Sequence, residues 1–174
     1  MEERGRIGRE PGEAVQPRGA TVMPGEGSAR VLVVDDDSEM RRLLADFLRG
    51  EGFRVEQAAD AADAFRRVGE AGYATIVLDN NLPGERGLDV LPRLRSVVPG
   101  TPVILITTMG DERTHEEAFS RGAYDLLLKP FSLDDLLAVL RRALDDAGGD
   151  SPASRPSPES APRTAHAFGH RARV

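Results

Sequence analysis

Aspartates, a threonine and a lysine follow the apolar runs of this chain, and together they could perform phosphoryl chemistry. Asp35 and Asp36 come directly after one apolar run, and Asp79 ends another. Two later runs end in Thr107 and Lys129. Three carboxylates held close together repel one another, so at least one pKa rises unless a cation lies between them. Oxygen ligands of this kind suit Mg²⁺, which keeps several waters and accepts carboxylates together with phosphate oxygens.

Asp79 is the candidate nucleophile of such a site. An aspartate can attack phosphorus to form an aspartyl-phosphate, and this transfer needs mainly positioning and neutralisation of charge. Mg²⁺, the Lys129 ammonium and the Thr107 hydroxyl could then surround the phosphoryl oxygens. Lys129 is the only lysine of the chain, which is consistent with a task that needs a compact ammonium. Taken alone, Asp79 also fits a simple turn, because aspartates hydrogen-bond their own backbone there.

The elements that must position these residues alternate regularly along the chain. Each run of strand character is followed by apolar residues at helical spacing, which predicts an α/β fold. We expect a doubly wound parallel sheet of five strands with helices on both faces, and a site beyond the carboxyl ends of the strands. The predicted strands cover residues 31–34, 53–57, 75–79, 103–107 and 124–128, and the predicted helices lie near 38–50, 60–68, 88–97, 112–121 and 132–144.

Capping residues define where several of these helices begin. Ser38 and Asp60 are candidate caps for the first two helices, and Ser132 with Asp135 resembles a capping box for the last. Pro92 is awkward inside the third helix, because proline lacks a backbone donor and is comfortable only in the first turn. That helix is therefore expected to start near Leu88 or Asp89, or to bend at the proline.

Composition narrows the class of protein. The chain has no cysteine and a net charge of −6, so disulfides are excluded and direct nucleic-acid binding is not expected. Nothing at the N-terminus resembles the apolar middle of a signal peptide, and no apolar run approaches the ~18 residues of a membrane span. We therefore expect a cytoplasmic protein without a membrane partner.

The two ends of the chain differ from its centre. Residues 1–29 are rich in Gly, Arg, Glu and Pro, and residues 147–174 are low in complexity. Both segments are expected to be disordered. Residues 30–146 form the predicted domain, and no output domain is expected beside it.

Four motifs of the central domain stand in the order and spacing of a known family. Residues 30–146 resemble the receiver domain of bacterial two-component response regulators, and the last motif is closest in wording to receivers of nitrogen-regulator-type proteins. The resemblance implies a flavodoxin-like fold with strand order 2-1-3-4-5. The motifs are Val31–Asp36, Leu78–Pro83 with Gly87, Pro102–Thr107 and Gly122–Phe131.

The resemblance also implies a role for each site residue. Asp79 would be the phosphoacceptor, and Asp36, Asp79 and the backbone carbonyl of Asn81 would bind Mg²⁺. Asp35 would act through a metal-bound water and would orient Lys129. Thr107 would supply the switch hydroxyl, while the peptide bond that follows Lys129 is typically cis in this family.

Three positions depart from the pattern of the family. Leu126 stands where a switch aromatic is usual, and Thr108 replaces the small residue that usually follows the switch threonine. Arg86 replaces the common Asp before Gly87, which is expected to have little effect on the chemistry. Thr108, Leu126 and Phe131 are the candidate residues of an output face.

The resulting hypothesis is a stand-alone receiver that signals rather than turns over a substrate. A sensor histidine kinase or a phosphotransfer protein would phosphorylate Asp79. The phosphorylated receiver would then dock to an unknown downstream target or form a homodimer. One alternative is a receiver that binds partners without phosphorylation. Another is a Mg²⁺-dependent phosphatase of the haloacid-dehalogenase type, but Asn81 occupies the place of the second aspartate which that family requires.

Overall fold

Strands and helices alternate along the chain in this computed structural model, which describes residues 29–148. The two predicted disordered segments lie almost entirely outside the described residues. The elements are β1 (Arg30–Val34), α1 (Ser38–Gly50), β2 (Arg54–Ala58), α2 (Ala61–Glu70), β3 (Thr75–Asp79), β4 (Asn81–Leu82), β5 (Glu85–Arg86), α3 (Gly87–Val97), β6 (Val103–Thr107), α4 (Glu112–Ser120), β7 (Asp125–Leu128) and α5 (Leu133–Gly148).

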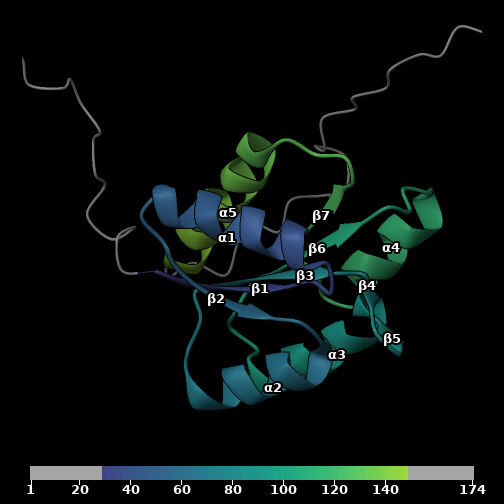
Figure 1. The fold of residues 1–174 in the computed structure, drawn as a ribbon. Coiled ribbons are helices and arrows are strands. Elements are labelled where there is room, and N and C mark those ends of the chain that lie inside the picture. The colour runs from purple at the N-terminus through teal and green to yellow at the C-terminus, as the bar shows by residue number, and fades with distance from the viewer. Residues whose placement is uncertain (1–28, 149–174) are drawn as a thin grey trace, which may run out of the picture.

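The central sheet has five parallel strands in the order β2-β1-β3-β6-β7. This order confirms the predicted 2-1-3-4-5 arrangement of a flavodoxin-like fold. β3 lies in the middle of the sheet and all five of its residues are buried. Its carboxyl end faces the side of the molecule where the β4–β5 hairpin lies (Figure 1).

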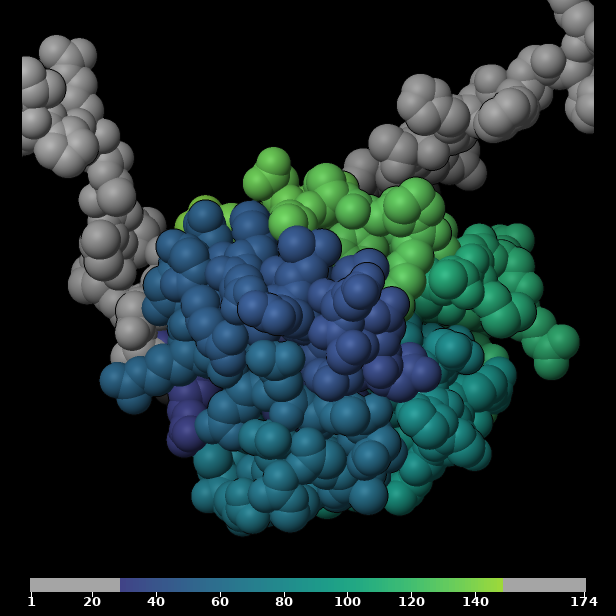
Figure 2. Space-filling view, in the orientation of Figure 1, coloured from purple at the N-terminus to yellow at the C-terminus, as the bar shows by residue number. Residues whose placement is uncertain are grey.

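Helices cover both faces of the sheet, and two apolar layers result. Side chains of α1 and α5 pack on one face, while those of α2, α3 and α4 pack on the other (Figure 1). Side chains alternate between the two faces along each strand: Leu32 enters the α2–α3 layer, and Val31 and Val33 enter the α1–α5 layer. In Figure 2 the atoms of α1 and α2 occupy much of the face toward the viewer, and those of α5 lie above them.

Aspartates begin the first two helices. The Asp37 carboxylate accepts hydrogen bonds from the backbone nitrogens of Glu39 and Met40, at 2.9 and 3.2 Å. The prediction of Ser38 as the cap was therefore wrong by one residue. Asp60 caps α2 as predicted, because its carboxylate accepts from the nitrogen of Asp63 at 2.8 Å.

The capping box before α5 is confirmed. The Ser132 hydroxyl accepts from the nitrogen of Asp135 at 3.0 Å, and the Asp135 carboxylate accepts from the nitrogen of Ser132 at 3.2 Å. Each side chain thus satisfies a backbone donor that the first turn of the helix leaves unpaired.

Helix α3 begins at Gly87, one or two residues before the expected start, so Pro92 lies in its second turn. Proline has no N–H for the carbonyl four residues earlier, which here belongs to Leu88. Arg121, at the end of α4, supplies the missing donor: its Nη1 lies 2.9 Å from the Leu88 carbonyl oxygen. The helix therefore tolerates Pro92 with the help of a side chain from a neighbouring helix.

A two-stranded hairpin between β3 and α3 was not predicted. Asn81 pairs with Arg86, and Leu82 pairs with Glu85. Gly84 turns the chain with a φ of 82°, a conformation that glycine adopts without the steric cost of a Cβ. The hairpin carries the chain from the end of β3 to the start of α3 in seven residues.

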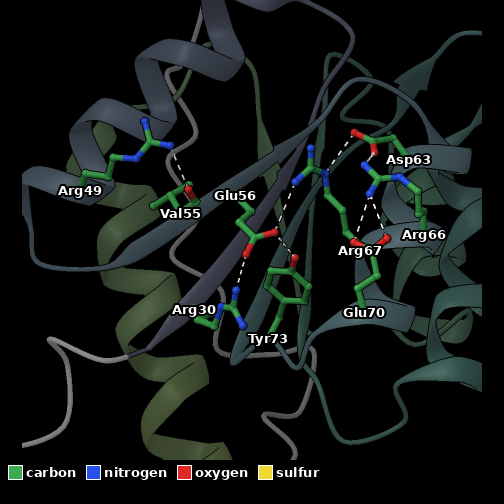
Figure 3. Close-up of polar contacts among 9 residues, drawn as sticks. All are labelled: Arg30, Arg49, Val55, Glu56, Asp63, Arg66, Arg67, Glu70 and Tyr73. Atoms are coloured by element: carbon green, nitrogen blue, oxygen red, sulfur yellow. Dashed lines mark hydrogen bonds and ion pairs between the residues drawn. The ribbon is translucent and has the colours of Figure 1, made fainter.

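A polar cluster covers the edge strand β2, which begins one residue later than predicted. The Glu56 carboxylate accepts from Arg30, from Arg67 and from the Tyr73 hydroxyl, at 2.5, 3.3 and 2.6 Å (Figure 3). Arg49 donates to the carbonyl of Val55 at 2.9 Å in the same view. These groups occupy polar surface beside an edge strand, which could otherwise pair with another chain.

None of the helices within residues 29–148 has both the length and the apolar character that a membrane crossing requires.

Candidate functional site

Asp79 lies at the carboxyl end of the central strand β3, as predicted, and is only 4% exposed. Strand β1 lies beside β3, and Asp35 and Asp36 follow its last residue. Asp35 is 1% exposed, whereas Asp36 is exposed. Because parallel neighbouring strands end at the same edge of the sheet, the three carboxylates converge: one oxygen of each lies within 4.8 Å of the others.

Lys129 connects two of these carboxylates. Its Nζ lies 3.1 Å from Asp79 Oδ1 and 3.3 Å from Asp35 Oδ2. The strand pairing positions the lysine, because its backbone nitrogen donates to the carbonyl of Thr107 at 2.8 Å. The bond between Lys129 and Pro130 is cis, as the resemblance implied. The ammonium group is therefore held at the same edge as the aspartates.

These residues surround a hollow of about 460 Å³. Thr107, at the end of β6, lines it and is 1% exposed. Asp35, which is 1% exposed, is not among the lining residues of this hollow. The lining residues are Asp36, Asp37, Asp79, Asn80, Asn81, Arg86, Thr107, Thr108, Met109 and Lys129.

Burial raises the pKa of the Asp79 carboxyl, and repulsion from the Asp35 carboxylate raises it further. Lys129 opposes both effects without cancelling them. The pKa of Lys129 is itself raised: burial acts to lower it, but attraction to Asp35 and Asp79 outweighs burial. The site therefore holds more negative charge than its single ammonium compensates.

The donor set fits a divalent cation of the Mg²⁺ type. Asp35, Asp36 and Asp79 carry three formal negative charges, and Lys129 contributes one positive charge. Carboxylate oxygens are the ligands that Mg²⁺ prefers, and a cation relieves repulsion among them. Asn81 lines the hollow as well, so its backbone carbonyl is a fourth candidate ligand.

Sequence reasoning missed Asn80. It is 8% exposed, and its carboxamide oxygen accepts from the backbone nitrogen of Leu88 at 3.1 Å. Its carboxamide nitrogen lies 3.4 Å from the Thr107 hydroxyl. A polar residue directly after a fully buried strand was the only available signal, and the adjacent turn formers gave it an ordinary explanation.

Gly87 brings the start of α3 against the phosphoacceptor candidate. Its nitrogen donates to the carbonyl of Asn80 at 2.8 Å. A Cβ at this position would lie 2.3 Å from the carbonyl oxygen of Asp79. Only a glycine permits this approach of two backbone segments without a shift.

Arg86 lies at the site itself, although the sequence suggested that it would have little effect on the chemistry. It lines the hollow, and its guanidinium forms ion pairs with Asp89 at 3.1 Å and Glu117 at 3.5 Å. Arg121 pairs with the same two carboxylates, at 2.8 and 2.7 Å. The rim of the hollow is thereby connected to helix α4, which carries Glu117.

The three candidate output residues lie in different environments. Thr108 is exposed at the rim of the hollow. Leu126 is 8% exposed and belongs to the layer beneath α2 and α3, while Phe131 packs against the α1–α5 layer. They do not form one continuous face in this structure, and their role in output remains a prediction.

The five-stranded order and the acidic edge define a class: doubly wound α/β domains with a carboxylate site at the strand ends. Comparison with known sequences identifies the family within this class. Residues 31–141 match the sequence profile of the response regulator receiver domain. The chain therefore belongs to the receiver domain family of two-component response regulators.

Relatives among known proteins agree with this assignment. The transcriptional regulatory protein SrrA of Staphylococcus aureus is 38% identical over 119 residues, which cover 66% of this chain and 49% of SrrA. The chain thus spans about half the length of the curated relatives that it matches.

Solved receiver structures resemble this one closely. A CheY-like receiver domain protein from Methanospirillum hungatei is 27% identical with a TM-score of 0.66, covering 68% of this chain and 95% of the other. The chemotaxis regulator CheY4 of Vibrio cholerae is 33% identical with a TM-score of 0.63, covering 67% and 99%. NtrX from Brucella abortus is 36% identical with a TM-score of 0.65, covering 69% of this chain and 28% of NtrX.

Proposed function

We propose that Asp79 accepts a phosphoryl group from the phosphohistidine of a sensor histidine kinase or phosphotransfer protein. A carboxylate oxygen of Asp79 attacks phosphorus while the bond from phosphorus to the histidine nitrogen breaks, and the imidazole leaves with the bonding electrons. The observation that carries this proposal is the buried Asp79 carboxylate, which faces a hollow with Lys129 Nζ at 3.1 Å.

Residues of the chain would divide the remaining work. Asp36, Asp79 and the Asn81 carbonyl would hold Mg²⁺, with Asp35 acting through water, and the ion would neutralise charge on the phosphoryl oxygens. Lys129 provides a second positive charge, and Asp35 holds it in place at 3.3 Å. The Thr107 hydroxyl would donate to a phosphoryl oxygen once the group is attached to Asp79.

The signal would leave the domain through docking to a downstream protein or through dimerisation. Three apolar side chains support a docking surface beside α4, since Met109, Phe119 and Leu128 are 57%, 39% and 43% exposed. Leu128 lies over Gly110, where an added Cβ would come within 2.6 Å of it. Gly110 follows Thr107 by three residues, so a displacement of Thr107 would also move the loop that contacts Leu128. That the domain acts alone remains a prediction of the sequence.

Incubation with acetyl phosphate and Mg²⁺, followed by intact mass measurement, tests the proposal. We expect one phosphoryl group, stable in acid and labile in base, that is absent from Asp79→Asn. Asp134→Asn is a matched control, because Asp134 is exposed at the start of α5 and does not line the hollow. A wild-type protein that neither gains mass nor binds beryllofluoride would contradict the proposal, and continuous phosphate release from unrelated monoesters would favour a phosphatase instead.

A further inference from the structure

Asn80 is fixed more firmly than its place after a strand requires. Its backbone nitrogen donates to the carbonyl of Ile106 at 2.7 Å, and its carbonyl accepts from the nitrogen of Gly87 at 2.8 Å. The residue is therefore tied to β6 on one side and to the start of α3 on the other. The residue as a whole is 8% exposed, so its side chain is enclosed by neighbouring groups.

The orientation of the Asn80 carboxamide follows from its partners. The backbone nitrogen of Leu88 is a donor, so the group that faces it at 3.1 Å must be the carboxamide oxygen. The NH₂ group then faces the other way, toward Thr107 Oγ1 at 3.4 Å. The helix start thus determines which end of the carboxamide the threonine meets.

The Thr107 hydroxyl receives a second donor as well. The backbone nitrogen of Met109 lies 3.1 Å from Thr107 Oγ1. A hydroxyl oxygen has two acceptor lone pairs and one hydrogen. With Asn80 and Met109 directed at the lone pairs, the hydrogen of Thr107 remains available to an acceptor in the hollow, which Asp79 and Lys129 also line.

We propose that Asn80 is a positioning residue, which holds the Thr107 hydroxyl as a hydrogen-bond donor to the phosphoryl group on Asp79. The proposal rests on the proposed function, because it requires a phosphoryl group on that aspartate. Because Asn80 donates to the Thr107 hydroxyl, the hydroxyl does not donate its own hydrogen to Asn80. The bond of 3.4 Å is long, so it also allows the hydroxyl to turn when a stronger, charged acceptor arrives.

A purely structural Asn80 would act only through Leu88, and two substitutions separate these roles. Asn80→Ala removes both side-chain bonds. Asn80→Asp keeps an acceptor for the Leu88 nitrogen, but it offers Thr107 an acceptor in place of a donor. The charge that Asp adds is cancelled by repeating both substitutions in a Thr107→Val background, since a double-mutant cycle isolates the pairwise contribution.

The first measurement is the affinity for beryllofluoride, a phosphoryl mimic, in the presence of Mg²⁺. Asn80→Ala is expected to weaken binding by about three- to tenfold, the range for loss of one hydrogen bond, and Asn80→Asp by more. In the Thr107→Val background, Asn80→Ala should change the affinity by less than about twofold. Asn80→Asp should there retain only the effect of its added charge. Thr75→Val is a control for the loss of a buried threonine hydroxyl, because within the described residues Thr75 Oγ1 is buried without a hydrogen-bond partner.

The second measurement needs neither metal nor phosphoryl group. Scalar couplings to the Thr107 methyl group report the side-chain rotamer, and we expect a single rotamer in the wild type and averaging among rotamers in Asn80→Ala. Equal losses of affinity with and without the Thr107 hydroxyl, or an unchanged rotamer distribution, would overturn the positioning role. A wild type that binds no beryllofluoride would instead contradict the proposed function, so the two failures are distinguishable.

Discussion

At Gly87, the absence of a side chain lets the start of α3 touch the backbone of Asp79. We expect Gly87→Ala to lower the free energy of unfolding by about 1–3 kcal/mol, the usual cost of forced overpacking, because the new Cβ would lie 2.3 Å from the Asp79 carbonyl oxygen. The shift that relieves this clash would also displace Asp79, so phosphorylation by acetyl phosphate should slow.

Gly69→Ala is the matched control for this prediction. Gly69 lies near the end of α2, and a Cβ there would meet nothing within 4 Å. Alanine in a helix should stabilise the protein by about 0.5–1 kcal/mol relative to glycine. Urea denaturation measures both variants, and a Gly87→Ala protein as stable as wild type would refute the close approach.

Tyr73 should titrate far above its ordinary range. Burial and the hydrogen bond to Glu56 raise the pKa of Tyr73 to about 12. Because the folded protein favours the neutral phenol, the stability that Tyr73 contributes is complete below pH ~10 and is lost as the pH rises toward 12. Ultraviolet absorbance of the phenolate follows this titration in Tyr124→Phe, in which Tyr73 is the only tyrosine left.

Glu56→Gln provides the comparison for Tyr73. It removes the carboxylate charge beside the phenol, so the titration midpoint of Tyr73 should fall. A midpoint near the ordinary tyrosine value in the parent protein would show that Tyr73 and Glu56 do not interact as described.

Individual residues were predictable where a strand end determined their position. Asp35, Asp79 and Lys129 were expected at one edge because parallel strands end together, and the structure brings them within hydrogen-bonding distance of one another through Lys129. Asn80 was not predictable, because its burial depends on how α3 docks against the end of β3. The contact with Leu88 becomes visible only once both elements are in place.

Among the helices, α3 and α4 are connected by Arg121, which bonds to the Leu88 carbonyl and to the Asp89 carboxylate. Arg121 donates to the Leu88 carbonyl that Pro92 leaves without its helical partner. We expect Arg121→Ala to lower the free energy of unfolding by about 1–2 kcal/mol, the cost of an unsatisfied carbonyl and a lost charged donor.

A double-mutant cycle with Pro92→Ala tests this account. Alanine at position 92 restores an N–H to the helix, so Arg121→Ala should cost about 1 kcal/mol less in that background. Chemical denaturation of the four proteins gives the coupling. If the two substitutions are additive, Arg121 acts only through its ion pairs with Asp89 and Glu117.

Elements were predicted well where a periodic pattern of apolar residues extended over a long segment, and less well where the segment was short. The five strands and five helices lie where the periodicity indicated, with shifts of one or a few residues. The β4–β5 hairpin was missed because two-residue strands carry no measurable period. The cap of α1 was misplaced because Asp37 and Ser38 are both good capping residues, and only the backbone conformation distinguishes them.

At the scale of the whole molecule, metal binding at the acidic edge would be coupled to stability. A ligand that binds only the folded state stabilises it, by about 1.4 kcal/mol at ten times the dissociation constant. Mg²⁺ should therefore raise the melting temperature of the wild type. The increase should be lost in Asp36→Asn and retained in Asp134→Asn, since only Asp36 belongs to the carboxylate cluster.

Chelation provides the reverse test of this coupling. Removing Mg²⁺ should return the wild type to the stability of the metal-free protein and leave Asp36→Asn unchanged. A wild-type melting temperature that is insensitive to Mg²⁺ would show that the three carboxylates do not bind the ion in the folded state.

Because Lys129 is the only lysine of the chain, it can be observed selectively by NMR. The chain contains no other lysine, and this one lies between Asp35 and Asp79. Isotopic labelling of lysine alone would therefore give one side-chain ammonium resonance, and that resonance would come from the centre of the site. The natural sequence thus carries its own spectroscopic reporter, without a tag or an introduced probe.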